Sequence, residues 1–262
     1  WGHGDQVAKA FFDQLDNPMH SVVFAIDTDF TLDEDYNYLF GAENPDTGNT
    51  NFEDLVINFI DDKNAQFAGE TEFNLIGYSF SWGGTDNSHL IDDIEPLFDI
   101  DSPIFTFAEP NVGVADDPYY PPWSDLFEDI ISVGAWNVDP GNYSLITDSP
   151  NLTETDILAD GAIEYGNEQD TLTGILGFGT SFATPRVMAE IVNFYEDYIY
   201  PLLEDSYDTI EQVWGSLVDP SEGYSGIVDY ILSAISKPVE ILFDDGSGEY
   251  IPYRVLADDY EA

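Results

Sequence analysis

Short apolar runs with strand character alternate with helical segments along the chain, and this alternation limits the folds open to it. The strand candidates are residues 21–27 (SVVFAID), 73–81 (FNLIGYSFS), 103–108 (PIFTFA) and 129–134 (DIISVG). Helical spacing of apolar residues predicts helices over 5–15, 52–62 and 88–98. This order favours βα units. We therefore predict an α/β fold of three layers, with a mainly parallel central sheet flanked by helices.

The last third of the chain is predicted to be mostly helical. A long helix is expected to run from Ser181 to about Tyr200, where Pro201 should end it. Two more helices are expected near 208–217 and 225–236. The tail 238–262 holds two short strand candidates around DDGSGEY, which indicate a hairpin.

Acidic residues dominate the charge of the chain. It contains 53 Asp and Glu against 5 Lys and Arg, which gives a formal net charge of -48 at pH 7. Repulsion between unpaired carboxylates is largely screened near 1 M salt, where the Debye length is about 3 Å, so the composition favours a salt-rich habitat. An ordinary acidic secreted protein and a protein with structural calcium at clustered Asp are the alternatives. Such a surface repels phosphates, so we expect no nucleic-acid partner.

Composition also excludes several classes of protein. Apolar residues make up 43% of the chain and aromatic residues 15%, which indicates a globular protein in spite of the charge. The absence of cysteine excludes a disulfide framework and a thiol nucleophile. No apolar run reaches the length of a membrane span. The chain begins at Trp1 without a Met, and we interpret it as a fragment whose true N-terminus is missing.

The stretch GFGTSFATPRV (177–187) puts Ser181 at the start of the long predicted helix. The first N–H groups of a helix have no intrahelical acceptor and favour negative charge, so they suit the oxyanion formed when a serine attacks a carbonyl. Gly179 and Ala183 would let a substrate backbone come close. On local chemistry alone, a helix cap made by Ser181 or Thr180 is the ordinary alternative.

A serine nucleophile needs a base, and the chain has three histidines. His3 is flanked by glycines and precedes the first predicted helix, so its ring could reach beyond a sheet edge. His20 lies in a turn, and His89 lies at a predicted helix start. Any of the three could be a surface histidine, but the surrounding sequence favours His3.

Two longer motifs carry a family resemblance. GHGDQVA (2–8) and GTSFATPRV (179–187) resemble the histidine and serine motifs of the subtilisin-like serine peptidases. Weaker similarities follow in the order of that family, at SWGG (81–84), FAEPNVG (107–113), IISVGAWN (130–137), ILADGA (157–162) and GYSGIVDYILSAI (223–235). The acidic sedolisin-type peptidases share the Gly-Thr-Ser motif, but GHGDQVA and EPNVG argue against that branch.

The resemblance covers about residues 1–236, which it identifies as a partial subtilisin-like peptidase domain that lacks its first strand. Residues 237–262 then form a C-terminal β-hairpin extension or the start of a further domain. The resemblance implies a secreted or cell-surface protein that acts on polypeptides. It implies no cofactor for the chemistry and no catalytic metal, although structural calcium would be compatible with it.

The same resemblance implies a role for each matched residue. Ser181 would be the nucleophile of a serine endopeptidase that works through an acyl-enzyme, with His3 as general base and then acid. Asn111 would donate a hydrogen bond to the oxyanion. The residues that would line the substrate cleft are Ser81, Trp82 and Gly83, or a register shifted to begin at Ser79.

The chain departs from the family pattern at several positions. The family Asp that orients the histidine lies on a strand before it, and that strand is absent here. Asp27 in FAIDTDF imitates this motif, but it follows His3 and would require a rewired topology. Pro110 stands where glycine is usual and Arg186 where histidine is common. We therefore expect low activity from this chain alone, and keep a second hypothesis, a catalytically inactive domain that acts as a binding or structural module of a larger surface protein.

Overall fold

The computed structural model describes part of the chain in detail. The described residues are 3–18, 45, 47–48, 51–66, 75–81, 103–109, 130–137, 144–145, 155–165, 174–242 and 250–257. They belong to two compact units, of which the first comprises Trp1–Ser21, Gly77–Asn87 and Ile104–Ala262 and the second Val22–Ile76 and Ser88–Pro103. The strand predicted at 21–27 and the helix predicted at 88–98 lie outside the described residues.

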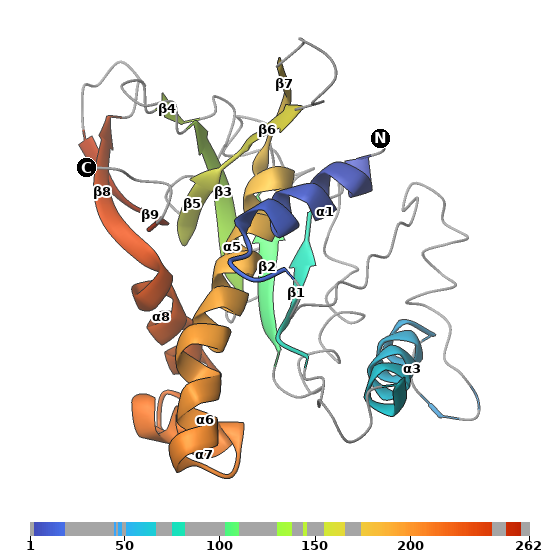
Figure 1. The fold of residues 1–262 in the computed structure, drawn as a ribbon. Coiled ribbons are helices and arrows are strands. Elements are labelled where there is room, and N and C mark those ends of the chain that lie inside the picture. The colour runs from blue at the N-terminus through green and yellow to red at the C-terminus, as the bar shows by residue number, and fades with distance from the viewer. Residues whose placement is uncertain are drawn as a thin grey trace. The chain divides into compact units, whose positions relative to one another are not determined.

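A mixed, mostly parallel sheet forms the centre of the first unit (Figure 1). Its strands follow the order β1-β2-β3-β5-β9-β8, and β4 pairs with the end of β3. Every pair is parallel except β3–β4 and β8–β9. The bounds are β1 Gly77–Phe80, β2 Ile104–Ala108, β3 Ile131–Asn137, β4 Ser144–Leu145, β5 Ile157–Asp160, β8 Ser236–Leu242 and β9 Tyr250–Leu256. The predicted α/β class is confirmed.

The strands of the sheet centre are mostly buried. All five residues of β2 are buried, as expected for a strand covered on both faces. Aromatic rings bind β1 to β2, with centroids 5.0 Å apart for Tyr78 and Phe105 and 4.5 Å apart for Phe80 and Phe107. Within the strand predicted over 73–81, β1 forms from Gly77, which pairs with Ile104, and the described residues Leu75 and Ile76 precede it; residues 73–74 lie outside the described residues. One residue earlier the partner would be Pro103, which has no N–H to donate to a ladder.

Helix α5 (Thr180–Phe194) contacts β1, β2, β3 and β5, and helix α1 (His3–Gln14) packs against α5 (Figure 1). α5 is unusually apolar, and Ala183, Val187 and Ile191 are fully buried in it. The sheet and α1 thus cover different sides of α5. A separate antiparallel pair, β6 (Ala162–Tyr165) and β7 (Gly174–Phe178), leads directly into the N-terminus of α5.

The prediction that Pro201 ends the long helix is wrong. A π-helical turn, η4 (Tyr195–Ile199), follows α5, and α6 (Tyr200–Ser206) continues with Pro201 in its first turn. A proline is tolerated there because the first N–H groups of a helix need no intrahelical acceptor. α7 (Ile210–Leu217) and α8 (Gly223–Ile235) follow, close to the bounds expected from the sequence. The Thr209 hydroxyl caps α7 by accepting from the Gln212 N–H.

The C-terminal tail joins the main sheet. β8 and β9 pair antiparallel from Ser236↔Leu256 to Leu242↔Tyr250, and β9 pairs parallel with β5 at Leu158↔Val255. The Ala257 N–H also donates to the Ile235 carbonyl at the end of α8. The two predicted tail strands therefore form an edge ribbon of the sheet.

In the second unit, the structure describes mainly helix α3 (Asn51–Gln66). The Thr47 hydroxyl donates to the Asp54 carboxylate near the helix start (2.9 Å). Toward its end, the Lys63 ammonium lies 5.4 Å from the centroid of the Phe59 ring. The helix predicted over 52–62 is thus confirmed and is slightly longer.

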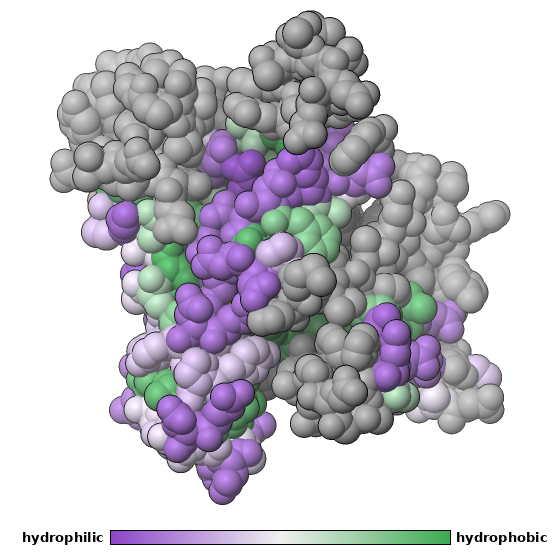
Figure 2. Space-filling model, in the orientation of Figure 1, coloured by the Kyte–Doolittle hydropathy of each residue, from purple (hydrophilic) through white to green (hydrophobic). Residues whose placement is uncertain are grey.

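Hydrophilic residues cover much of the described surface on the face that carries α1 (Figure 2). This agrees with the acidic composition, because the carboxylates must lie where water and ions reach them. None of the helices within the described ranges combines the length and the apolar character needed to cross a membrane.

Candidate functional site

The N-terminus of α5 holds Ser181 in its first turn. The N-cap is Gly179, with extended backbone and no side-chain cap hydrogen bond, and Thr180 is the first helical residue. The Phe182 N–H donates to the Gly179 carbonyl (3.1 Å). The alternative reading, in which Ser181 or Thr180 caps the helix, is therefore wrong, because Gly179 occupies the cap. Ser181 is partly exposed, and its hydroxyl makes no hydrogen bond with the other described residues.

The hydroxyl of Thr180 anchors this turn to the sheet. It donates to the Glu109 carbonyl (2.6 Å), at the residue that follows the last residue of β2. The Glu109 N–H in turn donates to the Val133 carbonyl of β3 (3.0 Å). The start of α5 is thereby fixed at the carboxyl edge of the parallel strands, where sites assemble in sheets of this kind.

Ser81 lies at the same edge and at the level of the α5 N-terminus. At the other end of β1, a Cβ on Gly77 would lie 2.7 Å from the Met188 side chain. Along β1, Ser81 lies four residues, or about 13 Å, beyond Gly77. Along α5, Thr180 lies eight residues, or about 12 Å, before Met188. Because Gly77 and Met188 are in contact and the two lengths are nearly equal, Ser81 and Thr180 lie at the same level. The Ser81 hydroxyl is buried and has no hydrogen-bond partner among the described residues.

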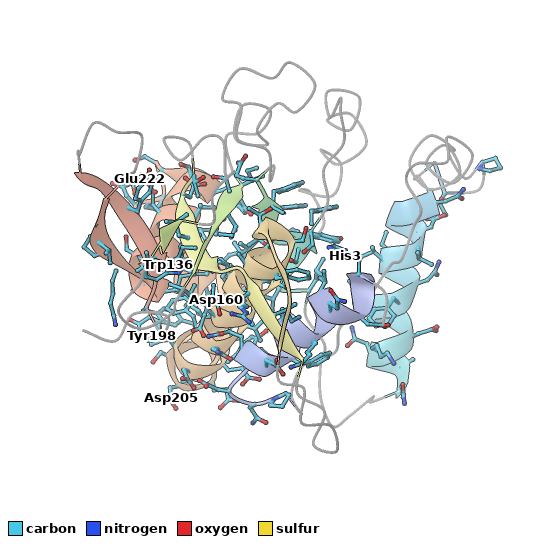
Figure 3. All side chains as sticks on the ribbon, turned by 90° about the horizontal axis from the view of Figure 1, so that it is seen from above. His3, Trp136, Asp160, Tyr198, Asp205 and Glu222 are labelled. Atoms are coloured by element: carbon cyan, nitrogen blue, oxygen red, sulfur yellow. The ribbon has the colours of Figure 1, made fainter. Side chains whose placement is uncertain are left out.

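Helix α1 brings His3 to the start of α5. The imidazole of His3, the first residue of α1, packs on the ring of Phe182 with centroids 5.6 Å apart and an interplanar angle of 43°. Phe182 directly follows Ser181 and is buried against Ala10 and Ile163. The structure therefore brings His3 beside the serine motif, and Figure 3 shows it at the beginning of α1.

Contacts at the far end of α1 fix its direction along α5. The Asn193 side chain accepts from the Asp16 N–H (3.0 Å) and donates to the Gln14 carbonyl (3.1 Å). His3 and Gln14 are as far apart in sequence as Phe182 and Asn193, so both helices span about 16 Å between the two contacts. The two helices run in the same direction and present their N-termini at one edge.

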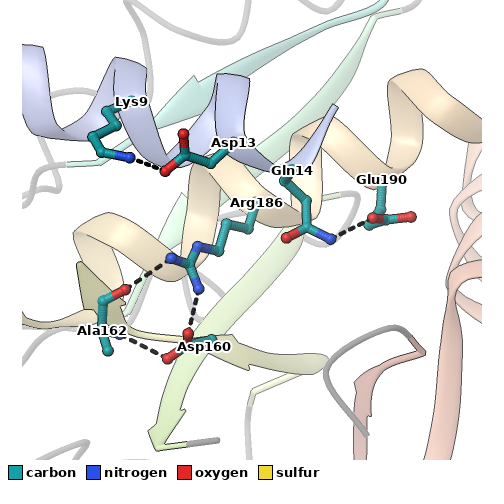
Figure 4. A network of polar contacts seen from close by, with 7 residues as sticks. All are labelled: Lys9, Asp13, Gln14, Asp160, Ala162, Arg186 and Glu190. Atoms are coloured by element: carbon teal, nitrogen blue, oxygen red, sulfur yellow. Dashed lines mark hydrogen bonds and ion pairs between the residues drawn. The ribbon is translucent and has the colours of Figure 1, made fainter. Parts of the chain in front are cut away.

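Arg186 links α5 to the end of β5 and the start of β6 (Figure 4). Its guanidinium donates to the Asp160 carboxylate (2.5 Å) and to the Ala162 carbonyl (2.8 Å). Asp160 also accepts from the Ala162 N–H (2.8 Å). The side chains of Arg186 and Asp160 are only 13% and 22% exposed, so water screens this ion pair weakly.

Several residues singled out in the sequence lie outside the described residues. They are Trp82, Gly83, Asn111, Pro110, Asp27, His20 and His89. Of the predicted site residues, the structure therefore places His3 beside the residue that follows Ser181, and Ser81 at the same edge of the sheet. Among the described residues no carboxylate contacts the His3 ring, and no cluster of three or more His, Asp or Glu side chains could hold a metal ion.

Sequence reasoning missed two members of this region. The sequence indicates Phe182 only as part of the serine motif, but its ring packs on His3. It indicates Asp160 only as part of a loop, but its carboxylate pairs with Arg186. The scarcity of basic residues was a usable signal, since an arginine in so acidic a chain is expected to have a carboxylate partner.

No protein-family model matches the chain, and none of the curated proteins is similar to it.

Proposed function

We propose that this chain is a subtilisin-like serine endopeptidase domain that cleaves polypeptides with Ser181 as nucleophile and His3 as base. The observation that carries the proposal is the packing of the His3 ring on Phe182, the residue next to Ser181. Two motifs far apart in sequence meet there, at the carboxyl edge of a mostly parallel sheet. A histidine beside a serine at a helix N-terminus is the arrangement that acyl transfer needs.

In the first step, the Ser181 hydroxyl attacks the carbonyl carbon of the scissile peptide bond. Its proton passes to the His3 imidazole, and as the bond between the serine oxygen and the carbonyl carbon forms, the C=O π electrons move onto the carbonyl oxygen, which becomes an oxyanion. His3 then gives the proton to the leaving amine nitrogen as the C–N bond breaks, which leaves an ester on Ser181. A water molecule repeats the sequence, with His3 again as base, and releases the carboxylic acid.

The oxyanion would be bound by backbone at the start of α5. The Phe182 N–H is used by Gly179, so the Ser181 N–H is the donor nearest the hydroxyl. Loss of one oxyanion donor typically costs about 3–4 kcal/mol of transition-state stabilisation. By resemblance, Asn111 would supply a second donor, and Ser81, Trp82 and Gly83 would pair with an extended substrate. The Ser81 hydroxyl, which is buried and has no partner within the described part of the chain, supports a ligand at that edge.

One observation favours the second hypothesis, a catalytically inactive domain. No carboxylate among the described residues contacts His3, and an orienting Asp can be worth about 10⁴ in turnover. Such a domain would keep the cleft and bind polypeptide without cleaving it. By the same resemblance, we propose a secreted or cell-surface location for either form.

A fluorophosphonate probe on the full-length protein separates the two functions. We expect covalent labelling at Ser181, detected by mass spectrometry of the peptide that contains residues 177–187. The Ser181→Ala variant should lose labelling and peptide hydrolysis, and His3→Ala should lower both by about 10³ or more. Absence of labelling in the folded wild-type protein, or hydrolysis unaffected by Ser181→Ala, would contradict the peptidase function.

A further inference from the structure

Arg186 and Asp160 close a ring of hydrogen bonds around the turn that carries Ser181. The Arg186 guanidinium holds both Asp160 and the Ala162 carbonyl. Gly161, between these two residues, accepts from the Gly179 N–H (3.0 Å). Gly179 in turn accepts from the Phe182 N–H, which returns the ring to α5.

The ring of hydrogen bonds fixes the chain both before and after Ser181. Gly179 precedes the serine by two residues and Arg186 follows it by five, and both are held by the three-residue segment 160–162. That segment is itself anchored to the sheet, since the Gly161 N–H donates to the Trp136 carbonyl of β3 (3.1 Å). A shift of residues 160–162 would therefore move Gly179 and the first turn of α5 with it.

The charge of the chain makes this use of arginine informative. The chain has only 5 basic residues to set against its acidic ones, yet the Arg186 side chain, five residues after Ser181 on α5, is only 13% exposed and pairs with Asp160 instead of neutralising the surface. A guanidinium can hold a carboxylate and a carbonyl at once through its planar fork, whereas an ammonium is a point charge. The Lys9–Asp13 pair on α1 is, by contrast, exposed at 34% and 51%.

We infer that Arg186 and Asp160 are positioning residues for the nucleophile: their pair fixes residues 160–162 and, through Gly179, the orientation of Ser181. This role rests on the peptidase function proposed above. Neither residue needs to touch the substrate. A displacement of about 1 Å at a reacting group can cost about 10²-fold in rate. The Arg186–Asp160 pair can therefore control the rate by fixing the position of Ser181, without touching the substrate.

The test compares probe labelling by the full-length wild type with Arg186→Met, Arg186→Lys and Asp160→Asn variants. We expect the labelling rate at saturating probe to fall about 10- to 100-fold in Arg186→Met and Asp160→Asn. The probe concentration for half-maximal rate should change little, because binding contacts remain. Arg186→Lys should give an intermediate rate, and the double variant should be no worse than either single variant. Lys9→Met is the matched control and should label at the wild-type rate.

Two readouts keep the inference falsifiable if a variant is less stable. Each labelling rate is divided by the fraction of folded protein, which near-ultraviolet circular dichroism measures. Hydrogen exchange of the Gly179 and Phe182 amides, followed by NMR, should accelerate in Arg186→Met and not in Lys9→Met. Wild-type exchange in Arg186→Met, or labelling at the wild-type rate, overturns the positioning role alone, whereas a wild-type protein that does not label overturns the peptidase function.

Discussion

Asp156 and Ser132 form a reciprocal polar contact between the starts of β5 and β3. The Ser132 N–H and hydroxyl both donate to the Asp156 carboxylate, at 2.8 and 2.9 Å, and the Asp156 N–H donates back to the Ser132 hydroxyl (3.0 Å). Burial raises the pKa of Asp156, and the hydrogen bonds from Ser132 only partly oppose it. The folded protein therefore binds a proton here more tightly than the unfolded chain does.

This shift predicts a pH-dependent difference between the wild type and Asp156→Asn. A raised folded-state pKa stabilises the protein fully below the unfolded pKa, near 4, and this contribution is lost as pH rises through the folded pKa. Asparagine does not titrate, so the free energy of unfolding of Asp156→Asn should improve relative to wild type from about pH 4 upward. Urea unfolding between pH 3 and 7 measures this difference.

Asp219 provides a control of opposite sign. Hydrogen bonds from the Ser221 N–H and hydroxyl lower the pKa of this exposed carboxylate. Its contribution is present above the unfolded pKa and lost as pH falls, so Asp219→Asn should become less stable than wild type as pH rises. The same pH trend in both variants would show that burial of Asp156 does not control its titration.

The role of a single residue could be predicted where a sequence motif contains it. It could not be predicted where it depends on which residue of another element lies next to it. Ser181 and His3 could be singled out from the sequence, and the structure brings them to one edge. The cap at Gly179 could not, because Ser and Thr are the usual caps and the Thr180 hydroxyl is instead taken by the Glu109 carbonyl. The partner of Arg186 depends on which loop lies against α5, and residue spacing does not encode that.

At the scale of elements, the placement of His3 depends on how firmly α1 is held along α5. Asn193, which is only 6% exposed, satisfies one N–H and one carbonyl at the end of α1. Gln14 also donates to the Glu190 carboxylate of α5 (2.6 Å; Figure 4). His3, the proposed base, is thus positioned from the opposite end of its own helix.

Asn193→Leu should loosen α1 without touching the candidate site. The substitution leaves the Asp16 N–H and the Gln14 carbonyl without a partner, which should cost about 1–3 kcal/mol of stability. Amide exchange in α1 should rise by more than in the rest of the first unit. The control is Asp13→Asn, which breaks only the exposed Lys9 pair and should cost under about 0.5 kcal/mol. Equal exchange of α1 in the two variants would contradict the role given to Asn193.

Elements were predictable to the extent that local pattern decides them. The buried run at β2 and the amphipathic runs at α1, α3 and α8 have clear signals, and all four formed. The errors occurred where distant contacts decide: Ile76, whose register faces Pro103, is not part of β1, and the helical chain continues through Pro201 by way of a π-helical turn. The pairing of β9 with β5 joins strands far apart in the sequence, and no local pattern reveals such a pairing.

At the scale of the whole molecule, the charge imbalance is expected to be the main cause of any dependence of stability on salt. With 53 acidic and 5 basic residues, pairs such as Arg186–Asp160 can neutralise only a small part of the charge. The remaining carboxylates repel one another, and this repulsion weakens as the Debye length falls from about 10 Å at 0.1 M salt to about 3 Å at 1 M. The free energy of folding should therefore depend strongly on ionic strength.

We expect the melting temperature to rise steeply and continuously between 0.05 and 2 M NaCl, because screening acts on all carboxylates at once. Calcium sites would instead give a rise that saturates at millimolar CaCl₂ and is reversed by EDTA, because a few sites fill and then contribute no more. Sucrose is the matched control, since it stabilises folded proteins without screening charge. A melting temperature unchanged by NaCl would favour an ordinary acidic protein. A melting temperature that responds to millimolar CaCl₂ but not to NaCl would show that bound calcium ions, and not charge screening, stabilise the fold.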